Sequence, residues 1–429
     1  MRVIADLHIH GRFSRATSKS MTISEIARYS RIKGLDIVAT GDFSHPKWLE
    51  EMENLLVFEP DTGLYTIKDQ KNPTRFVITT EVSTIFTYAG QVRKIHHVII
   101  TPSIEIALQI NERLNKFGNL SSDGRPQLDL NAPALVEEIM EVSPHNLLFP
   151  AHAWTPWFGI LGASSGFNSI EECYQDMTKH IHALETGLSS DPPMNWRLSK
   201  LDKLTLLSNS DCHSYWPWRL GREANVFELT KPSYTEIIDT IRSKDKSRFK
   251  FTIETDPAYG KYHWTGHRKC NVSLSPREAL KFRNICPVCR KKLTKGVEQR
   301  VEEIADRPTD FKAENNIGFI RLISLTEIIQ TVLGVSSPAS PKVSIIYSQF
   351  IAKFGNEYSV LIDVAKEDLS TVRPDVADAI IRVREGRVHV TPGYDGVYGQ
   401  PVLFEEKQQA KNTVKRVQQL NIFDFQNGR

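Results

Sequence analysis

Short apolar runs alternate with stretches of helical spacing along the first half of the chain. The runs predict buried strands. The stretches between them predict helices, such as one that begins at the capping box Thr22-Ile-Ser-Glu25 and ends at Gly34. Strands that alternate with helices favour an α/β fold with a mainly parallel sheet or barrel. The predicted strands lie at residues 2–10, 35–39, 75–79, 94–100, 147–149, 183–184 and 204–207.

Side chains able to bind metal follow most of these strands. His8 and His10 end the first one, and residues two apart in a strand point to the same face, so both imidazoles can reach one ion. In parallel barrels the catalytic groups lie at the carboxyl ends of the strands. Imidazole and carboxylate ligands suit two or three divalent ions (Zn, Mg or Mn) bound for phosphoester hydrolysis. The candidate ligands are His8, His10, Asp42, His45, Glu81, His97, His152, Asp211 and His213.

A second metal site is predicted in the middle of the chain. His267 and Cys270 form one pair, Cys286 and Cys289 another, and fifteen residues separate the pairs. This spacing is typical of a small zinc module, in which three thiolates and one imidazole close a structural zinc site. His263 is an alternative fourth ligand. The segment is rich in basic residues that form either a solvated face or, as we favour, phosphate contacts to DNA: Arg268, Lys269, Arg283, Arg290, Lys291, Lys292 and Lys295.

The final third of the chain has the spacing of a helical domain. Helices are predicted at 313–333, 343–354, 358–364 and 374–384, and a glycine-rich hairpin at 388–399. Tyr394 and Tyr398 in this hairpin are candidate DNA contacts. We therefore expect a barrel over 1–245, a zinc module over 250–300, a helical domain over 301–404 and a tail over 405–429.

The tail carries a short motif. Gln419, Ile422 and Phe425 resemble a sliding-clamp-binding peptide, although one aromatic residue of that pattern is missing. The alternative is a terminal segment that packs on its own domain, because exposed aromatic residues otherwise remain unburied.

Composition restricts the possible partners. The 429 residues carry a net charge of +3, so any affinity for nucleic acid must come from local patches. No apolar run approaches the roughly 18 residues of a membrane span, and the N-terminus has no signal-peptide pattern. Three of the five cysteines are clustered, which favours a metal site in a reducing compartment. We expect a cytoplasmic protein, monomeric by default.

The ligand-bearing motifs resemble those of the PHP (polymerase and histidinol phosphatase) family. That resemblance implies a distorted (β/α)7 barrel with up to three metals. Where the family usually has Thr-Asp-His, this chain has Gly-Asp42-Phe-Ser-His45, which leaves open whether Asp42 or His45 is the ligand. His96 and His97 point to opposite faces of their strand, and we favour His97 because it precedes an apolar run as in the family.

Over nearly its whole length the chain resembles the endonuclease Q family, PHP-type DNA repair enzymes associated with archaea and thermophiles. The resemblance implies metal-dependent hydrolysis of the phosphodiester on the 5′ side of a deaminated base (uracil, hypoxanthine or xanthine) or of an abasic site. It is carried by residues 6–14, 40–42, 185–197, 208–213, 267–289 and 392–398.

Two groups of loop residues are further candidates. Glu185, Asp191 and Arg197 belong to a block that resembles a site loop, where Asp191 is either a metal or substrate contact or only a turn residue. Aromatic residues follow two of the ligand-bearing strands and either pack on the barrel or stack on an unpaired nucleotide. These aromatic residues are Trp157, Trp216 and Trp218.

Two other functions compete with a nuclease. A small-molecule phosphatase, similar to a histidinol-phosphate hydrolase, would use the same barrel but leaves the zinc module without a role. A non-catalytic adaptor for DNA or a sliding clamp would keep only a relic of the metal site, which the nearly complete ligand set argues against.

Overall fold

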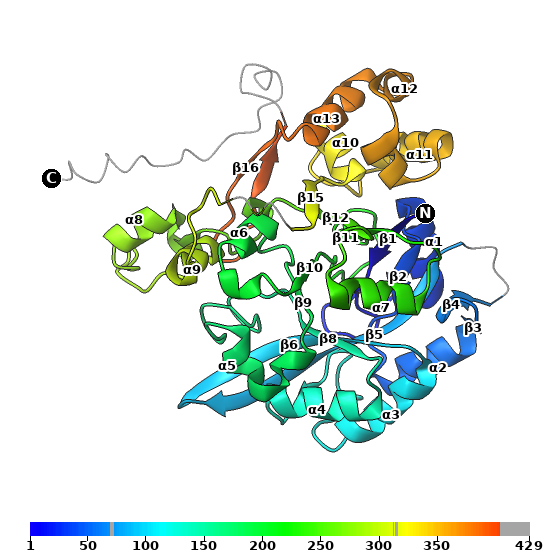
Figure 1. Cartoon of the computed structure of the whole chain (residues 1–429). Helices are drawn as coiled ribbons and strands as arrows, with labels where there is room; N and C mark the ends of the chain where they lie inside the picture. Colours follow the sequence, from blue (N-terminus) through cyan, green and yellow to red (C-terminus); the bar gives the residue numbers. More distant parts are fainter. Residues whose placement is uncertain (69–72, 312, 314–315, 404–429) are drawn as a thin grey trace.

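A mixed sheet of eleven strands forms the core of the molecule. The computed structural model describes residues 1–68, 73–311, 313 and 316–403, and Figure 1 shows the sheet surrounded by helices, with the helical domain at its upper end. The strands of the sheet are β1 (Arg2–Asp6), β2 (Ile37–Ala39), β3 (Leu56–Glu59), β4 (Leu64–Ile67), β5 (Arg75–Tyr88), β6 (Gln91–Thr101), β7 (Gln127–Leu128), β8 (Leu147–Pro150), β11 (Ala224–Glu228), β12 (Phe249–Glu254) and β15 (Gly318–Arg321).

The α/β class predicted from the sequence is confirmed, but the strand directions are mixed. β1, β2 and β5 are parallel neighbours, as are β9 (Ala183–Glu185) and β10 (Thr205–Leu207). β6 runs antiparallel to β5 and β8, and β11 runs antiparallel to β1 and β12. The reversal after β5 has a local cause, because Ala89 and Gly90 both have positive φ, as a tight hairpin turn requires.

The alternation of side chains along β1 divides the core into two parts. Val3, Ala5 and Leu7 contribute to one apolar cluster, and Ile4 contributes to the other. Asp6, His8 and His10 are also buried, at alternate positions of the same segment. The expected side-by-side placement of the two histidines therefore follows from the two-residue period of the strand.

Helices cover the sheet, and α1 begins and ends where the sequence predicts. The side chain of Thr22 accepts a hydrogen bond from the amide of Glu25, and Gly34 ends the helix at φ 95°. The helices of this part are α1 (Ile23–Lys33), α2 (Pro46–Leu55), α3 (Ile104–Leu114), α4 (Ala132–Val142), α5 (Ile170–Tyr174), η1 (Gln175–His180), α6 (Pro192–Trp196), η2 (Ser199–Leu201), α7 (Tyr234–Ser243) and η3 (Pro257–Tyr259).

The predicted zinc module projects from the side of the sheet, well separated from α3 and α4 (Figure 1). It contains the short hairpin of β13 (Thr265–His267) and β14 (Val272–Leu274), with η4 (Arg268–Cys270) between them. Two helices, α8 (Pro276–Lys281) and α9 (Val297–Ile304), complete it. Its own apolar core is small and consists of Val272, Leu274, Ala279, Cys286 and Leu293.

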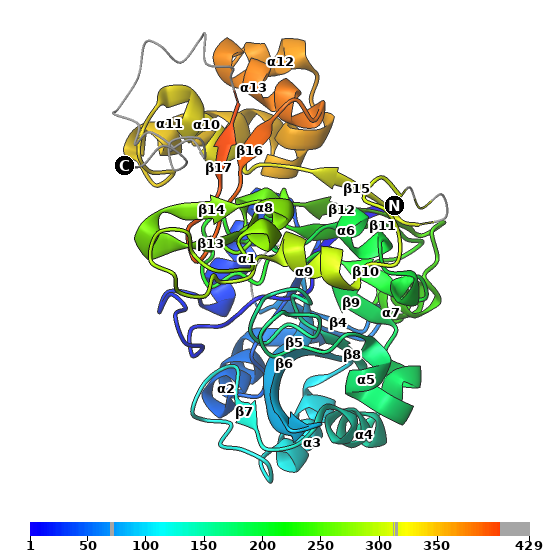
Figure 2. The ribbon, with the colours of Figure 1, turned by 90° about the vertical axis from the view of Figure 1, so that its left-hand side faces the viewer.

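The helical C-terminal region stands above the sheet in both views (Figure 2). Lys33 of α1 donates a hydrogen bond to buried Glu357 at 2.8 Å, and the Tyr358 hydroxyl donates to the carbonyl of Gly221, so this region is fixed to the part of the chain that contains the sheet. Its elements are α10 (Leu325–Leu333), α11 (Pro341–Phe354), the π-helix η5 (Ser359–Asp363), α12 (Lys366–Ser370), α13 (Pro374–Arg384), β16 (His389–Thr391) and β17 (Gln400–Val402).

The predicted helix over 313–333 is wrong in its first half. Residues 318–321 form β15, which pairs in parallel with β12 and extends the sheet beyond residue 245. The open edge of β12 provides main-chain partners that local spacing does not reveal. The helix starts only after Ser324, whose side chain accepts a hydrogen bond from the amide of Glu327.

No helix within the described ranges is long and apolar enough to cross a membrane. The possible clamp peptide at Gln419, Ile422 and Phe425 lies outside the described residues.

Candidate metal centre

Four side chains from distant parts of the chain meet at one end of the sheet. The Nε2 atom of His10 lies 3.0 Å from an Asp211 carboxylate oxygen and 3.2 Å from the Oε2 atom of Glu81. The Nε2 atom of His8 lies 3.7 Å from the same Glu81 oxygen and 3.8 Å from Asp211. One donor atom from each of these four residues falls within 4.8 Å of all the others. A single divalent ion can therefore contact all four.

Glu81 also belongs to a second group of donors. Its other oxygen, Oε1, lies 2.8 Å from the Nδ1 atom of His96 and 3.0 Å from the Nε2 atom of His152. These two imidazole nitrogens are 3.1 Å apart. Glu81 thus offers one oxygen to each group, which is the arrangement of a carboxylate that bridges two ions.

The donors fit divalent metal in their chemistry and in their burial. The Nε2 atom of His8 is buried and has no hydrogen-bond partner among the described residues. An unpaired buried polar atom is costly, and a metal ion would satisfy it. His8, His10 and Glu81 are almost completely buried, whereas 27% of the Asp211 side chain is exposed. The cluster is therefore open to a substrate on the Asp211 side.

A second layer of hydrogen bonds orients the three imidazoles that present Nε2. Glu185 contacts the Nδ1 atom of His8 at 3.0 Å, and Asp42 contacts the Nδ1 atom of His10 at 2.9 Å. The hydroxyl of Thr155 lies 2.9 Å from the Nδ1 atom of His152. Such contacts fix the ring orientation of a ligating histidine and strengthen it as a ligand. Glu185 and Asp42 therefore hold the rings of His8 and His10 so that their Nε2 atoms point toward the other donors.

The charges of the cluster stabilise one another. Burial alone lowers the pKa of His8, but the carboxylates of Glu185 and Glu81 outweigh it and raise the pKa well above its usual value. Burial raises the pKa of Glu81, yet His96 and Arg125 bring it well below its usual range. The pKa of Asp211 is also well lowered, because His10 and His8 outweigh burial. The carboxylates are therefore ionised at neutral pH, as metal ligands must be, whereas a metal ion would have to displace the proton of His8.

Three residues of this region have a positive φ, a backbone conformation that residues other than glycine rarely adopt. φ is 51° at Asp42, 27° at His152 and 45° at Asp211. Such a conformation costs on the order of 1–3 kcal/mol per residue and persists only where the surrounding structure enforces it. Its concentration here is typical of a functional site.

The structure brings His96, in place of the favoured His97, into the cluster. In the β5–β6 hairpin His96 pairs with Ser83, so its side chain shares a face with Glu81, two residues away. His97 points to the opposite face, where its ring nitrogens contact the hydroxyls of Tyr174 and Thr84. A shift of one residue moves a side chain to the other face of a strand, and the doublet alone does not define which face is inward.

Two other candidate histidines lie beside the cluster. His45 stacks on Phe13 with 4.5 Å between ring centroids and is absent from both donor groups found in the described residues. His213 stacks on His10, also at 4.5 Å, and its Nε2 atom is 3.8 Å from Asp211. The sequence left open whether Asp42 or His45 is a metal ligand. Asp42 contacts the candidate ligand His10, whereas His45 contacts none of the donor residues of the two groups.

Asp191 and Arg197 lie away from the two donor groups. Asp191 is the N-cap of α6, where it accepts a hydrogen bond from the Met194 amide and forms an ion pair with Arg321. Arg197 donates two hydrogen bonds to Glu302 of α9, at 2.8 and 3.1 Å. These contacts give both residues a structural role in joining α6 to later segments.

The loop between α3 and β7 contributes a residue that the sequence patterns missed. The Nη1 atom of Arg125 donates a hydrogen bond to the Oε2 atom of Glu81 at 3.1 Å. Arg125 follows no predicted strand and belongs to no metal-binding spacing, so only the folded loop reveals its position.

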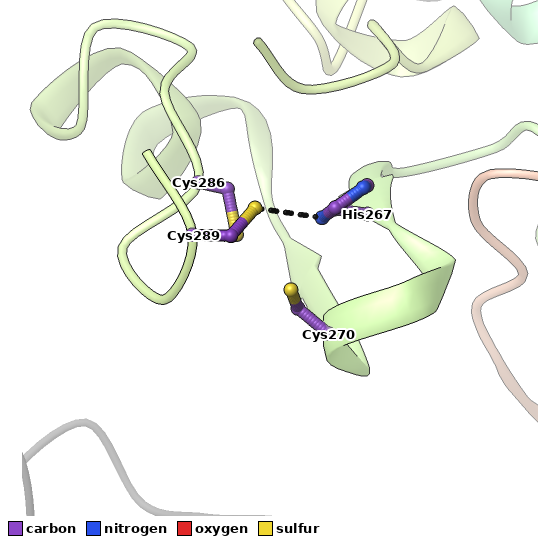
Figure 3. Close-up of side chains that lie close together, drawn as sticks. All are labelled: His267, Cys270, Cys286 and Cys289. Carbon is purple, nitrogen blue, oxygen red and sulfur yellow. Dashed lines mark hydrogen bonds between the residues drawn. The ribbon is translucent and has the colours of Figure 1, made fainter. Parts of the chain in front are cut away.

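The four predicted zinc ligands are close together (Figure 3). His267 and Cys270 come from the β13–η4 segment, and Cys286 and Cys289 come from the loop after α8. All four donor atoms lie within 4.8 Å of one another, with 3.3 Å between the Cys289 sulfur and the His267 Nδ1 atom. Three thiolates and one imidazole match a closed tetrahedral site. The alternative ligand His263 is instead 3.6 Å from Glu298.

The candidate DNA contacts are largely exposed. Trp157 and Trp216 expose 44% and 40% of their surface, and Trp216 stacks on Trp218 at 5.2 Å. Tyr398 is 42% exposed, while the Tyr394 hydroxyl donates to Asn271 of the zinc module. The basic residues Arg268, Lys269, Arg290 and Lys291 are all exposed. Aromatic side chains after two of the ligand-bearing strands and basic side chains of the module are thus available to solvent.

Comparison with known proteins gives the family. Two crystal structures superpose on this chain, each with a TM-score of 0.84. One is the lesion-specific endonuclease PfuEndoQ from Pyrococcus furiosus. The other is endonuclease Q in complex with a 27-mer duplex substrate with an abasic lesion at the active site. The first is 32% identical and both chains are covered completely; the second is 33% identical, with 95% of this chain and 98% of the other covered. The chain belongs to the endonuclease Q family.

The chain is also similar in sequence to two uncharacterized proteins. The uncharacterized protein YqxK of Bacillus subtilis is 28% identical over 93% of this chain and 98% of its own length. The uncharacterized protein MJ0043 of Methanocaldococcus jannaschii is 34% identical over 58% of this chain, which corresponds to 31% of MJ0043. The family model of the MJ0043 C-terminal domain matches residues 324–387, the helical region of this endonuclease Q family member.

Proposed function

We propose that this protein is a metal-dependent DNA repair endonuclease that hydrolyses the phosphodiester on the 5′ side of a deaminated base or an abasic site. The observation that carries the proposal is the bridging position of Glu81 between two groups of donors, in a chain that matches the lesion-specific endonuclease of Pyrococcus furiosus over its full length. A site of this kind suits hydrolysis of a phosphodiester, because two ions can stabilise both the attacking and the leaving oxygen.

The residues have distinct roles in this proposal. One ion would be held by His8, His10, Glu81 and Asp211, and a second by Glu81, His96 and His152. Divalent ions in such a site lower the pKa of water and neutralise the charge that develops on the phosphate. Glu185 and Asp42 hold the rings of His8 and His10 in place. Asp211, the exposed member of the cluster, faces the incoming substrate.

The remaining candidate contacts would bind the duplex. Exposed basic side chains on the proposed zinc module, such as Arg290 and Lys291, suit phosphate contacts that do not depend on sequence. Exposed Trp157 and Trp216 offer faces on which an unpaired base can stack. Turning out a lesion nucleotide costs least where it is mispaired or damaged, which would assist selection of the lesion.

The test is a cleavage assay on 5′-labelled duplexes that contain a single uracil, hypoxanthine or abasic site, with Mg²⁺, Mn²⁺ or Zn²⁺. A labelled product that ends immediately before the lesion supports the proposal. Asp211→Ala should abolish cleavage but retain DNA binding, whereas loss of binding with unchanged cleavage per bound complex would contradict the assigned role. Release of phosphate from histidinol phosphate without nicking would favour a phosphatase, and neither activity would favour an adaptor.

A further inference from the structure

Arg125 is the one arginine of the described residues whose side chain bonds directly to the donor cluster. It donates from Nη1 to the bridging carboxylate of Glu81, and this is its only side-chain hydrogen bond within the described part of the chain. About a quarter of the side chain is exposed, 24% against 0% for Glu81. Arg125 therefore lies at the open edge of the cluster, near Asp211. Its guanidinium contacts Glu81, and part of the side chain is accessible to solvent.

The loop that carries Arg125 is fastened to the site from three directions. The Gly124 amide donates to the carbonyl of Phe13 at 3.2 Å, and the Ser44 hydroxyl donates to the carbonyl of Gly124 at 3.1 Å. On the other side of Arg125, the carbonyl of Pro126 accepts a hydrogen bond from Ser83 at 2.9 Å. The loop contacts the segment between β1 and α1, the segment between β2 and α2, and β5, so the guanidinium is held in place before any substrate arrives.

The glycine before Arg125 makes this close approach possible. A Cβ atom at Gly124 would lie 2.5 Å from a carboxylate oxygen of Asp42 and 2.5 Å from the hydroxyl of Ser14. Neither neighbour can withdraw freely, because Asp42 also bonds to His10 and to the Gly11 amide, and the Ser14 hydroxyl contacts the His10 ring at 3.3 Å. A side chain at this position would push the loop, and Arg125 with it, away from the cluster.

The charge balance indicates what Arg125 binds during the reaction. Its partner oxygen, Oε2 of Glu81, is also the one that faces His8 and His10 in the first donor group. When divalent ions occupy both groups, this edge of the cluster gains positive charge, and a guanidinium there is stabilised only if an anion enters as well. A phosphodiester supplies that anion, and two of its oxygens match the planar fork of an arginine.

We propose that Arg125 is a catalytic residue that binds a non-bridging oxygen of the scissile phosphate. This inference rests on the proposed phosphodiester hydrolysis and names a further residue for it. As the oxygen of water bonds to phosphorus and the bond from phosphorus to the leaving sugar oxygen breaks, with the proton of water ending on that sugar oxygen, Arg125 stabilises the negative charge on the non-bridging oxygen. It stays protonated throughout, so it moves no proton and contributes through its charge and its hydrogen bonds.

The first test compares Arg125→Gln and Arg125→Lys with the control Arg113→Gln, which breaks the pairs of Arg113 with Glu138 and Glu141 on α3 and α4. With enzyme in excess over an abasic duplex, Arg125→Gln should slow single-turnover cleavage about 100–1,000-fold. Arg125→Lys should recover part of the rate, and the control should cleave like wild type. Catalytic metal should bind Arg125→Gln at least as tightly as wild type, because a competing cation has been removed.

A second test does not depend on cleavage. DNA affinity is measured in Ca²⁺ for duplexes with an ordinary or a neutral methylphosphonate linkage at the cleavage position. The ratio of the affinity for the charged linkage to the affinity for the neutral linkage should be about 10-fold larger in wild type than in Arg125→Gln. Equal preference in both proteins, or loss of metal from Arg125→Gln, would overturn the inference in favour of a role in holding Glu81. If wild type cleaves no lesion duplex at all, the proposed function itself fails, which is a separate outcome.

Discussion

The carboxylate of Glu185 lies 3.0 Å from the Nδ1 atom of His8 and so leaves the Nε2 atom of that ring directed at the donor cluster. Glu185 is fully buried and also accepts hydrogen bonds from the His152 amide at 2.7 Å and from Asn209 at 2.8 Å. One carboxylate thereby positions two of the proposed ligand residues, one through its ring and one through its backbone.

Replacing Glu185 by Gln should weaken catalytic metal binding without unfolding the protein. The amide group of glutamine turns one acceptor into a donor, so the contacts to His8, His152 and Asn209 cannot all be kept. Loss of such an orienting contact typically lowers metal affinity by about 10–100-fold. Competition with a chromophoric chelator measures this affinity, and Glu228→Gln at the exposed N-terminal ion pair is the matched control. Unchanged affinity in Glu185→Gln would contradict the orienting role.

The adjacent histidines His96 and His97 should respond differently to the same substitution. His96→Asn removes a donor from the second group and should reduce the content of catalytic metal and lower cleavage by 100-fold or more. His97→Asn should leave cleavage within a few-fold of wild type. It should instead lower the free energy of unfolding by about 1–3 kcal/mol, because the buried hydroxyls of Tyr174 and Thr84 lose their partner.

Metal analysis, cleavage rates and thermal unfolding of the two variants are compared side by side. The reverse pattern, with cleavage lost only in His97→Asn, would restore the assignment made from the sequence.

How far the sequence predicts the site depends on how local each signal is. His8 and His10 share a strand, so their common face follows from its two-residue period. The four zinc-module residues were found from spacing alone because each pair lies within one short turn. The choice between His96 and His97 depends instead on the register between β5 and β6, which pairs His96 with Ser83. Register depends on how two strands pair, so the sequence His96-His97 alone does not determine it.

The misassigned and missed elements share a non-local cause. β15 forms because its main chain pairs with β12, 67 residues earlier in the chain. Its apolar spacing also fits a helix. Arg125 reaches Glu81 because contacts from Phe13, Ser44 and Ser83 hold its loop. None of these partners is close to Arg125 in sequence, so no motif search can find the contact.

The zinc module should lose its fold when a ligand is removed. Its own core has only five buried residues, too few to fold a segment of this length without metal. Cys286→Ser should lose one equivalent of zinc and become sensitive to proteolysis between residues 268 and 292, while the far-ultraviolet circular dichroism of the barrel persists. Cys173→Ala, at a buried cysteine outside the predicted zinc site, should keep its zinc. Full zinc content in Cys286→Ser would contradict the assigned ligand.

Stability should depend on pH through two buried carboxyls, Glu223 and Glu254. Burial raises the pKa of Glu254 to about 8, partly offset by hydrogen bonds such as the one from Thr252 at 2.5 Å. Burial and the neighbouring Glu254 raise the pKa of Glu223 well above its usual value. Between the usual glutamate pKa and about 8, the folded state therefore keeps protons that the unfolded state has lost.

Unfolding in this window takes place with release of protons, so stability falls as pH rises, by up to about 1.4 kcal/mol per pH unit for each carboxyl. Glu254→Gln removes one ionisable group and keeps a neutral partner for Thr252 and Thr186. The variant should gain stability relative to wild type between pH 5 and pH 8, as followed by thermal unfolding at constant metal concentration. Exposed Glu367→Gln is the control and should follow wild type at each pH. A constant difference between Glu254→Gln and wild type across this range would show that Glu254 does not hold its proton.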